Sequence, residues 1–444
     1  MIYYFIGIKG SGMSSLASLM HDLGYKVMGS DKEDHFFTQV GLEKRNIKML
    51  PFNKDNIKED MIIVQGNAFN DNHEEVVRAH ELNLKIYTYQ EMIDTLTKDT
   101  KLIAISGCHG KTTTTTMMAK VFENIGINYL IGDGTGYAKK GNDYFALEAC
   151  EFKRHFLSYH PYISVITNVE LDHTDYFKDL DDVKNAFESF ANNARYYVVA
   201  CGDDENTRSL KIDKPVLYYG FNEKNDVVAK NITHDEEKTT ADIYIKGKKY
   251  ETFTFPFVGD HLLLNVMAVI SVCYLENLDK KEVKKQISKI EHAKRRFIEE
   301  KFKSNIIIDD YAHHPTEVKV TIEAAKKKYP NRKVIAIFKA HTKSRVKYFH
   351  KEFADALNIA DKAYVMPIGE DRIEVGYEDV THFDILKDCN NGEEITLETP
   401  EKLLQYENCV LLFMSSKDIY FLEEKYKELA NWSEPNFWHF KKRT

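Results

Sequence analysis

The stretch ISGCHGKTTTTTMMAK, residues 105–120, decides how the surrounding chain folds. It follows an apolar run that is typical of a buried strand, and it leads into apolar residues at helical spacing. Between strand and helix stand Gly107 and Gly110, followed by Lys111 and five threonines. Glycines let a backbone approach an anion closely, and a helix N-terminus adds partial positive charge. The stretch therefore predicts a strand–turn–helix unit that binds phosphate.

This phosphate loop is shorter than the general GxxxxGK[ST] pattern, because Ile105 stands where the first glycine would be. It still offers Lys111 to the β- and γ-phosphates of a nucleotide and the Thr112 hydroxyl to Mg²⁺. The same residues also fit a turn with an exposed lysine and no ligand. The strand and helix on either side favour the phosphate interpretation.

Two later strand ends supply further candidate ligands for a magnesium–nucleotide site. FALEACE contains Glu148 and Glu151, and ITNVELDHTDYF contains Asp172 and His173. Mg²⁺ prefers oxygen ligands and keeps several waters, so one or two carboxylates plus phosphates suffice. A histidine is an unusual ligand for Mg²⁺. From the residues alone, His173 is more simply explained as a loop histidine.

Length and composition limit the class of protein. A chain of 444 residues is too long for one hydrophobic core, so two or three domains are expected. The net charge of −8 argues against nucleic acid as a partner. No apolar run is long enough to cross a membrane. The six cysteines lie far apart without a CxxC pair, which favours reduced thiols in a cytoplasmic protein.

The order of apolar segments predicts an α/β fold with parallel sheets. Short β-rich runs alternate with helical patterns along the whole chain, except for a more β-rich segment at 215–257. Polar stretches and changes in this rhythm place domain boundaries near residues 98 and 297.

A second glycine-rich turn, GIKGSGMSS, follows the first expected strand. Gly7, Gly10 and Gly12 have GxxGxG spacing, and Asp31 stands at the end of the next strand. This arrangement is compatible with a pyrophosphate ligand, although it also fits a tight turn that binds nothing. Two phosphate sites in separate domains favour an enzyme that brings a nucleotide-linked substrate together with ATP. They argue against a simple dehydrogenase.

Together with GDHLLLN (259–265), KRRF (294–297) and DDYAHHPTEV (309–318), these motifs resemble the Mur ligase family over essentially the whole chain. The resemblance is greatest to members of low-GC Gram-positive bacteria that act on UDP-N-acetylmuramate and L-alanine. It implies a Rossmann-like UDP-sugar domain (1–97), a central P-loop ATPase domain (98–297) and a Rossmann-like C-terminal domain (298–444) for the amino acid.

The resemblance also implies an activity. A cytoplasmic enzyme of peptidoglycan precursor synthesis would use ATP and Mg²⁺ to phosphorylate the lactyl carboxylate of UDP-N-acetylmuramate. The amine of L-alanine would then attack the acyl phosphate. This chemistry depends mainly on positioning and on neutralising charge.

Matched residue by residue, the resemblance assigns four groups of functional positions. Nucleotide binding falls to Gly107, Cys108, His109, Gly110, Lys111, Thr112, Thr113, Asn265, Arg296 and Asp310. The metal ligands are Thr112, Glu148 and His173. The UDP-sugar would contact Gly10, Ser11, Gly12, Met13, Ser14 and Asp31. The catalytic residues would be Lys111, His173, Tyr311, His313, His341 and Arg345.

The sequence departs from the family pattern mostly in the last domain. FKAHTKSR differs at Lys339, Ala340 and Lys343, and Leu262 replaces an asparagine found beside the adenine in many relatives. FMSSKDI has Ser-Ser-Lys at 415–417 where the family commonly has Gly-Ala-Gly, and loss of glycine disfavours positive φ.

Three alternatives therefore stay open: an alanine ligase with a drifted loop, a ligase with another amino-acid or peptide acceptor, and a paralogue that binds without turnover. The retained Lys111, Thr112, Glu148 and His173 argue against the last.

Overall fold

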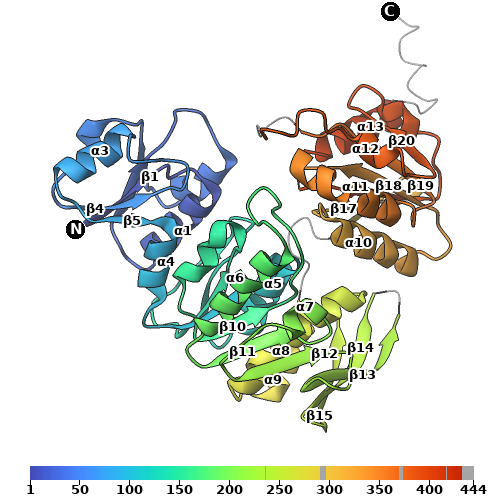
Figure 1. Ribbon diagram of the computed structural model, residues 1–444, viewed down its shortest axis with the longest axis horizontal. Helices are drawn as coiled ribbons and strands as arrows, with labels where there is room; N and C mark the ends of the chain where they lie inside the picture. The colour runs from blue at the N-terminus through green and yellow to red at the C-terminus, as the bar shows by residue number, and fades with distance from the viewer. Residues whose placement is uncertain (236, 291–296, 370–373, 417, 433–444) are drawn as a thin grey trace, which may run out of the picture. The chain divides into compact units, whose positions relative to one another are not determined.

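The chain is α/β throughout, with three separate sheets (Figure 1). It divides into two compact units, residues 1–171 with 176–291 and residues 172–175 with 292–444. Within the described part of the chain, no helix is both long and apolar enough to cross a membrane. The computed structural model describes residues 1–235, 237–290, 297–369, 374–416 and 418–432.

The first sheet has five parallel strands in the order β3-β2-β1-β4-β5. Its central strand, β1, ends in the fully buried Tyr4, Phe5 and Ile6. Near-continuous apolar runs are expected where helices cover both faces of a parallel sheet. The strands are β1 (Ile2–Ile6), β2 (Val27–Ser30), β3 (Lys48–Leu50), β4 (Met61–Gln65) and β5 (Ile86–Thr88). The helices are α1 (Ser11–Asp22), α2 (Val40–Glu43), α3 (Glu74–Glu81) and α4 (Tyr89–Thr97), with 3₁₀ turns η1 (Phe37–Gln39) and η2 (Lys54–Asn56).

A buried carboxylate ties this sheet to its surroundings. Glu75 of α3 has no exposed surface, and it accepts hydrogen bonds from the Tyr4 hydroxyl at 2.9 Å and the Asn56 amide at 3.0 Å. It also accepts from the Asn53 backbone N–H at 3.1 Å and from the Ser30 hydroxyl at 2.5 Å. Buried polar groups are tolerated when they are hydrogen-bonded in this way. Glu75 therefore fixes the end of β2, next to Asp31.

The second sheet has ten strands in the order β15-β14-β13-β12-β11-β10-β6-β9-β7-β8. Strands β8, β14 and β15 pair antiparallel, and the other pairings are parallel. The strands are β6 (Lys101–Ser106), β7 (Ile127–Leu130), β8 (Gly136–Tyr137), β9 (Tyr144–Glu148), β10 (Ile163–Ile166), β11 (Tyr197–Cys201), β12 (Val216–Gly220), β13 (Val227–His234), β14 (Thr239–Ile245) and β15 (Lys248–Phe255). The helical segments are α5 (Lys111–Val121), η3 (Phe152–Ser158), α6 (Leu180–Asn192), α7 (Glu205–Arg208), α8 (Asp260–Leu275) and α9 (Lys280–Ile287).

Helix α8 lies within the core of this second domain. It is apolar on all sides, and residues 266–273 are all buried. A helix without a polar face is expected only in such a fully covered position. It packs beside α5, the helix that follows the phosphate loop. The same compact unit also joins the first two sheets, because the Ser15 hydroxyl of α1 donates to the Gly134 carbonyl at 2.5 Å.

The third sheet has six strands in the order β16-β17-β21-β18-β19-β20, parallel except for β16. The strands are β16 (Ile298–Phe302), β17 (Asn305–Asp310), β18 (Val334–Lys339), β19 (Lys362–Met366), β20 (Gly392–Glu394) and β21 (Val410–Met414). The helical segments are α10 (Pro315–Lys328), α11 (Lys343–Leu357), α12 (Phe383–Leu386), η4 (Pro400–Leu403) and α13 (Tyr420–Trp432). Polar loops follow the carboxyl ends of β17, β18 and β21, where open α/β sheets bind ligands.

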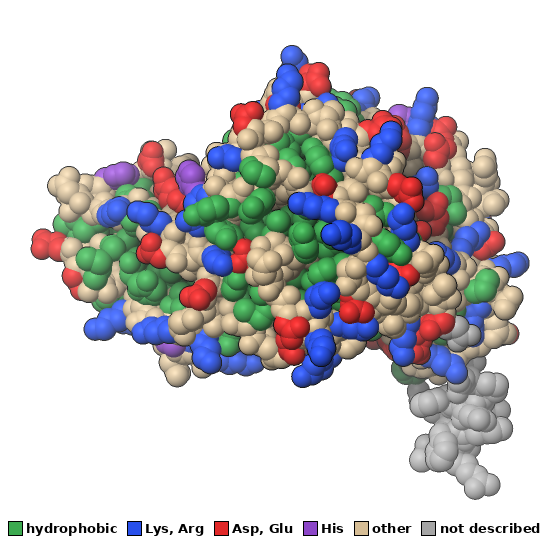
Figure 2. Space-filling view, turned by 90° about the horizontal axis from the view of Figure 1, so that it is seen from below, with side chains coloured by type: hydrophobic (Ala, Val, Ile, Leu, Met, Phe, Trp, Pro, Cys, Tyr) green, Lys and Arg blue, Asp and Glu red, His purple; other side chains and the backbone are tan. Residues whose placement is uncertain are grey.

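The predicted α/β class with three domains is confirmed, and the β-rich segment at 215–257 forms β12–β15. The boundaries at 97/98 and 297/298 stay predictions. On the face shown in Figure 2, acidic and basic side chains are interspersed, as the modest net charge leads one to expect. None of the six cysteines, all of which lie within the described residues, forms a disulfide.

We expect Glu75→Ala to destabilise the first unit by about 3 kcal/mol or more, because it leaves the buried Tyr4 and Ser30 hydroxyls without their acceptor. Thermal and urea unfolding measure the change. Glu74→Ala is the matched control, since Glu74 is exposed on the same helix; its effect should stay within about 0.5 kcal/mol. Equal effects of the two substitutions would contradict the role of Glu75.

Candidate functional site

The phosphate loop joins β6 to α5 and has no room for side chains at its two glycines. Gly107 has φ +142° and Gly110 has φ +81°, a range that favours glycine. A Cβ on Gly107 would lie 2.0 Å from Thr167 Oγ1, and one on Gly110 would lie 2.6 Å from Asn265 Oδ1. Both glycines are therefore required by the local structure, whatever the loop binds.

Lys111 is the first residue of α5, and its ammonium group is held within the loop. Nζ donates to the carbonyls of Gly107 at 2.5 Å and Cys108 at 3.2 Å, and it forms an ion pair with Glu151 Oε1 at 2.9 Å. Burial opposes the charged ammonium, but the Glu151 carboxylate outweighs this effect. The pKa of Lys111 is therefore raised above its usual value, and the lysine is fully protonated.

The hydroxyl of Thr112 lies beside a carboxylate. Thr112 Oγ1 donates to Glu148 Oε1 at 3.1 Å, and Gly132 N–H donates to Glu148 Oε2 at 2.7 Å. One hydroxyl and one carboxylate are the oxygen donors that Mg²⁺ takes alongside water and phosphate. The two residues thus fit a magnesium ion. Two further threonines, Thr115 and Thr116, instead donate to backbone carbonyls one turn earlier in α5.

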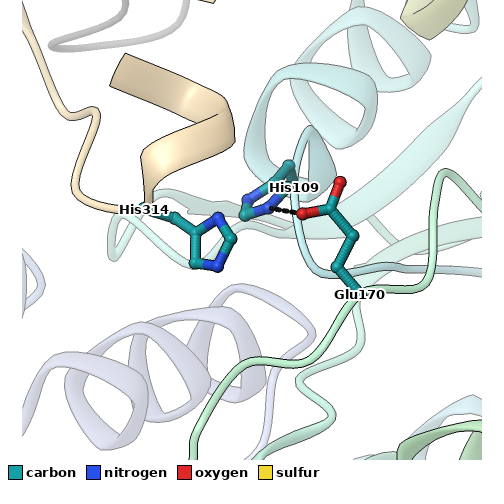
Figure 3. Close-up of side chains that lie close together, drawn as sticks. All are labelled: His109, Glu170 and His314. Atoms are coloured by element: carbon teal, nitrogen blue, oxygen red, sulfur yellow. Dashed lines mark hydrogen bonds and ion pairs between the residues drawn. The ribbon is translucent and has the colours of Figure 1, made fainter. Parts of the chain in front are cut away.

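The segment after β10 supports the phosphate loop, and the sequence analysis did not single out its role. Because β10 pairs with β6 in parallel, the two strand ends meet. Asn168 Oδ1 accepts from the His109 backbone N–H at 2.9 Å, and the Cys108 thiol contacts the Glu170 backbone. His109 Nε2 lies 3.4 Å from Glu170 Oε2 (Figure 3). In the sequence, the mostly polar residues TNVE (167–170) directly after an apolar strand are the pattern that could have indicated this supporting role.

The other predicted nucleotide residues are distributed along the chain. Asn265, from α8, lies against Gly110, and Thr113 is buried in the first turn of α5. Asp310 ends β17 in the second unit, where its carboxylate accepts from the backbone N–H groups of Phe297 and Ala312, each at 2.8 Å. Arg296 lies outside the described residues. The nucleotide roles of all these residues stay predictions.

A cavity of about 570 Å³ opens at the glycine-rich turn after β1. Five of the six residues predicted to contact a UDP-sugar line it: Gly10, Ser11, Gly12, Met13 and Asp31. The sixth, Ser14, is buried in α1, and its hydroxyl donates to the Ser11 carbonyl at 3.1 Å. The remaining lining residues are Gly7, Lys9, Lys32, Phe36, Thr38, Gly66, Asn67, Ala68, Phe69 and Tyr89.

Lys9 and Asp31 hold the walls of this cavity in place. The Asp31 carboxylate accepts from the Lys9 backbone N–H at 2.7 Å, which fixes the glycine-rich turn. The Lys9 ammonium donates to the carbonyls of Lys32 at 2.7 Å and Asp34 at 2.8 Å. Sequence reasoning missed Lys9, because a lysine inside a glycine-rich turn gives no indication of which carbonyls it will reach.

The second unit contains a smaller cavity of about 210 Å³. Five predicted catalytic residues line it: His173, Tyr311, His313, His341 and Arg345. Lys111, the sixth, belongs to the first unit. The other lining residues are Asp172, Thr174, Asp175, Thr342 and Ser344. His173 has φ +50°, a conformation that non-glycine residues rarely adopt and that often marks functional sites.

A buried ion pair forms one wall of the smaller cavity. Arg345 Nη2 lies 2.7 Å from Asp172 Oδ1, and Nε of the same arginine lies 3.1 Å from that oxygen. Burial opposes the charged carboxylate, but Arg345 and, to a lesser degree, the neighbouring histidines outweigh it. The pKa of Asp172 is therefore well below its usual value. The pKa of Arg345 is raised because the attraction of Asp172 exceeds the cost of burial.

The unusual serines after β21 are also tied to this region. The Ser415 hydroxyl donates to the Lys339 carbonyl at 2.9 Å, and Ser416 Oγ lies 3.1 Å from His341 Nδ1. Neither serine has positive φ, so the backbone at 415 and 416 does not need glycine. Ser415, which stands at a glycine position of the family pattern, therefore adopts a conformation open to any residue. Lys417 lies outside the described residues.

Comparison with known families matches three consecutive segments of the chain. Residues 2–101 match the Mur ligase family catalytic domain, residues 105–273 the Mur ligase middle domain, and residues 295–409 the Mur ligase glutamate ligase domain. These matches follow the three sheets in order.

Solved structures agree with this assignment. UDP-N-acetylmuramate-alanine ligase of Thermotoga maritima is 26% identical, with a TM-score of 0.76, over 98% of this chain and 100% of that one. The murein peptide ligase of Psychrobacter arcticus is 22% identical, with a TM-score of 0.68, over 97% and 99% of the two chains. MurF ligase of Thermotoga maritima in complex with ADP is 18% identical, with a TM-score of 0.67, over 86% and 97%. The last two comparisons show a shared fold.

We expect Asp172→Asn to destabilise the protein at pH 7 by about 3–5 kcal/mol, because it leaves Arg345 buried without its counter-charge. The pKa of Asp172 is lowered on folding. The stability from this pair is therefore complete above the unfolded value of about 3.9 and is lost as pH falls through the lower folded value.

Thermal unfolding of the unsubstituted protein and of Asp172→Asn between pH 3 and pH 7 measures their difference in stability. This difference should shrink below about pH 4. Asp379→Asn, at an exposed position of the same unit, is the control and should behave as the unsubstituted protein. If the difference in stability between Asp172→Asn and the unsubstituted protein did not vary with pH, it would not come from an ion pair between Asp172 and Arg345.

Proposed function

The chain belongs to the Mur ligase family, and we propose that it joins L-alanine to the lactyl carboxylate of UDP-N-acetylmuramate at the expense of ATP. Members of this family are ATP-dependent ligases that form amide bonds in peptidoglycan synthesis. The observation that carries the finer proposal is the full-length similarity to the alanine ligase of Thermotoga maritima. We place the reaction in the cytoplasm, as a step of peptidoglycan precursor synthesis.

The phosphate loop supplies the groups that phosphoryl transfer needs. Lys111 is protonated and starts a helix whose N-terminus favours anions, so it can neutralise charge on the β- and γ-phosphates of ATP. Thr112 and Glu148 would hold Mg²⁺, which when bound supplies further positive charge to the phosphates. His173 is proposed, on resemblance alone, as a ligand of a second Mg²⁺ ion.

The two cavities suit the two other substrates. The cavity of about 570 Å³ beside the glycine-rich turn falls within the size range of small-molecule sites, about 300–1,000 Å³, and would hold the UDP-sugar. The cavity of about 210 Å³ is below that range, which favours a small amino acid over a peptide. Its histidines and Arg345 would orient the amine and carboxylate of L-alanine towards the acyl phosphate.

Phosphate release from ATP, Mg²⁺ and UDP-N-acetylmuramate across a panel of acceptors tests the proposal. The panel contains L-alanine, glycine, L-serine and the recycled tripeptide. Stimulation by L-alanine alone is the expected result. Preference for another acceptor would support the proposed ligase reaction but replace L-alanine as its substrate. Binding of UDP-N-acetylmuramate without turnover of any acceptor would indicate a non-catalytic paralogue.

We expect Lys111→Met to lower phosphate release by at least ~100-fold, because it removes the positive charge nearest the proposed phosphate position. Lys120→Met is the matched control, since Lys120 lies in the same helix and forms an ion pair with Glu123. The control should keep the unsubstituted rate. Circular dichroism of both variants checks that the fold is retained. Full activity of Lys111→Met would exclude this lysine from the chemistry.

A further inference from the structure

Glu151 is a buried carboxylate that contacts Lys111 of the phosphate loop. It lies three residues beyond the end of β9, and only 1% of its side chain is exposed. Its Oε1 atom lies 2.9 Å from Lys111 Nζ. Glu148, the other acid of this segment, is engaged with the Thr112 hydroxyl and the Gly132 N–H. Glu151 thus accepts a hydrogen bond from Lys111, while Glu148 accepts one from Thr112.

Lys111 is saturated by these protein contacts. An ammonium group has three N–H donors. Three acceptors surround it: the carbonyls of Gly107 and Cys108, at 2.5 Å and 3.2 Å, and the Glu151 carboxylate at 2.9 Å. A phosphate oxygen that binds Lys111 must therefore replace at least one of them. The carboxylate is the charged member of the set, and its interaction with the lysine is the one that an anionic ligand replaces most directly.

We propose that Glu151 is a positioning residue that competes with nucleotide phosphates for Lys111. It holds the lysine in the loop before the nucleotide binds, and it takes the lysine back when ADP leaves. The inference rests on the proposed nucleotide site. The nucleotide binds only the state in which Lys111 is released from Glu151. Its apparent affinity is therefore lowered in proportion to the fraction of protein in that state. The ion pair with Glu151 therefore weakens nucleotide binding and speeds release of ADP.

Glu151→Gln keeps the size of the side chain and removes its charge. We expect the Kd for ADP to fall about tenfold, mainly through slower dissociation, because most affinity changes at one site appear in the dissociation rate. The KM for ATP should fall together with kcat, since ADP leaves more slowly. The KM for UDP-N-acetylmuramate should not change. A merely structural role for Glu151 would not separate the two substrates in this way.

Calorimetry and stopped-flow dissociation of a fluorescent ADP, with and without Mg²⁺, measure these changes. Glu123→Gln is the matched control, because Glu123 is exposed and pairs with Lys120 on the surface of α5. Its affinity for ADP should equal that of the unsubstituted protein. Glu151→Asp keeps the charge and should stay closer to the unsubstituted protein than Glu151→Gln does.

A double-mutant cycle tests whether Glu151 acts through Lys111. In a Lys111→Met background, Glu151→Gln should no longer tighten ADP binding. The same tightening in that background would mean general repulsion of the phosphates and would overturn the proposal. Unchanged or weaker ADP binding by Glu151→Gln, in a variant that melts like the unsubstituted protein, would also overturn it.

Two further outcomes are kept separate. If the unsubstituted protein binds no ADP, the proposed function itself fails. If Glu151→Gln does not fold, a crystal structure of the unsubstituted protein with ADP decides the matter. Lys111 moved from Glu151 to a phosphate would support the proposal, and Lys111 still bound to Glu151 with no phosphate contact would overturn it.

Discussion

The turn between β6 and α5 cannot accommodate a side chain at Gly107 or Gly110, and the phosphate loop depends on this constraint. Parallel pairing of β6 with β10 brings Thr167 and Asn168 against the turn, so that the backbone of the loop passes close to them. The loop then delivers Lys111 and Thr112 to the start of α5. Glycine is needed here because of this close approach as well as because of positive φ.

The buried charges of the protein are compensated within short distances. Lys111 pairs with Glu151, and Asp172 pairs with Arg345. Glu75 has no cation among its described hydrogen-bond partners and is instead surrounded by neutral donors. Removing one partner of such a pair costs far more than the pair contributes to stability, because the remaining charge stays buried. A buried pair beside a ligand site is therefore also a means of adjusting how strongly a charged ligand binds.

The two cavities differ in what their walls can recognise. The larger one is lined by glycines and by residues of the first turn of α1, where backbone N–H groups are available to an anion. The smaller one is lined by histidines, carboxylates and an arginine, groups suited to an amine and a carboxylate. Ser416, beside His341, belongs to the same environment, and its neighbour Ser415 replaces a glycine of the family pattern without positive φ.

The sequence by itself determined the α/β class, the positions of both glycine-rich turns and the residue types gathered at strand ends. Local periodicity and turn chemistry specify these features, because they act within a few residues of the chain. Only the tertiary structure decided which of these groups meet. Lys111 and Glu151 are 40 residues apart, and Lys9 contacts carbonyls more than 20 residues away. Such contacts depend on strand order and on the direction of long side chains, which a single sequence does not encode in any local pattern.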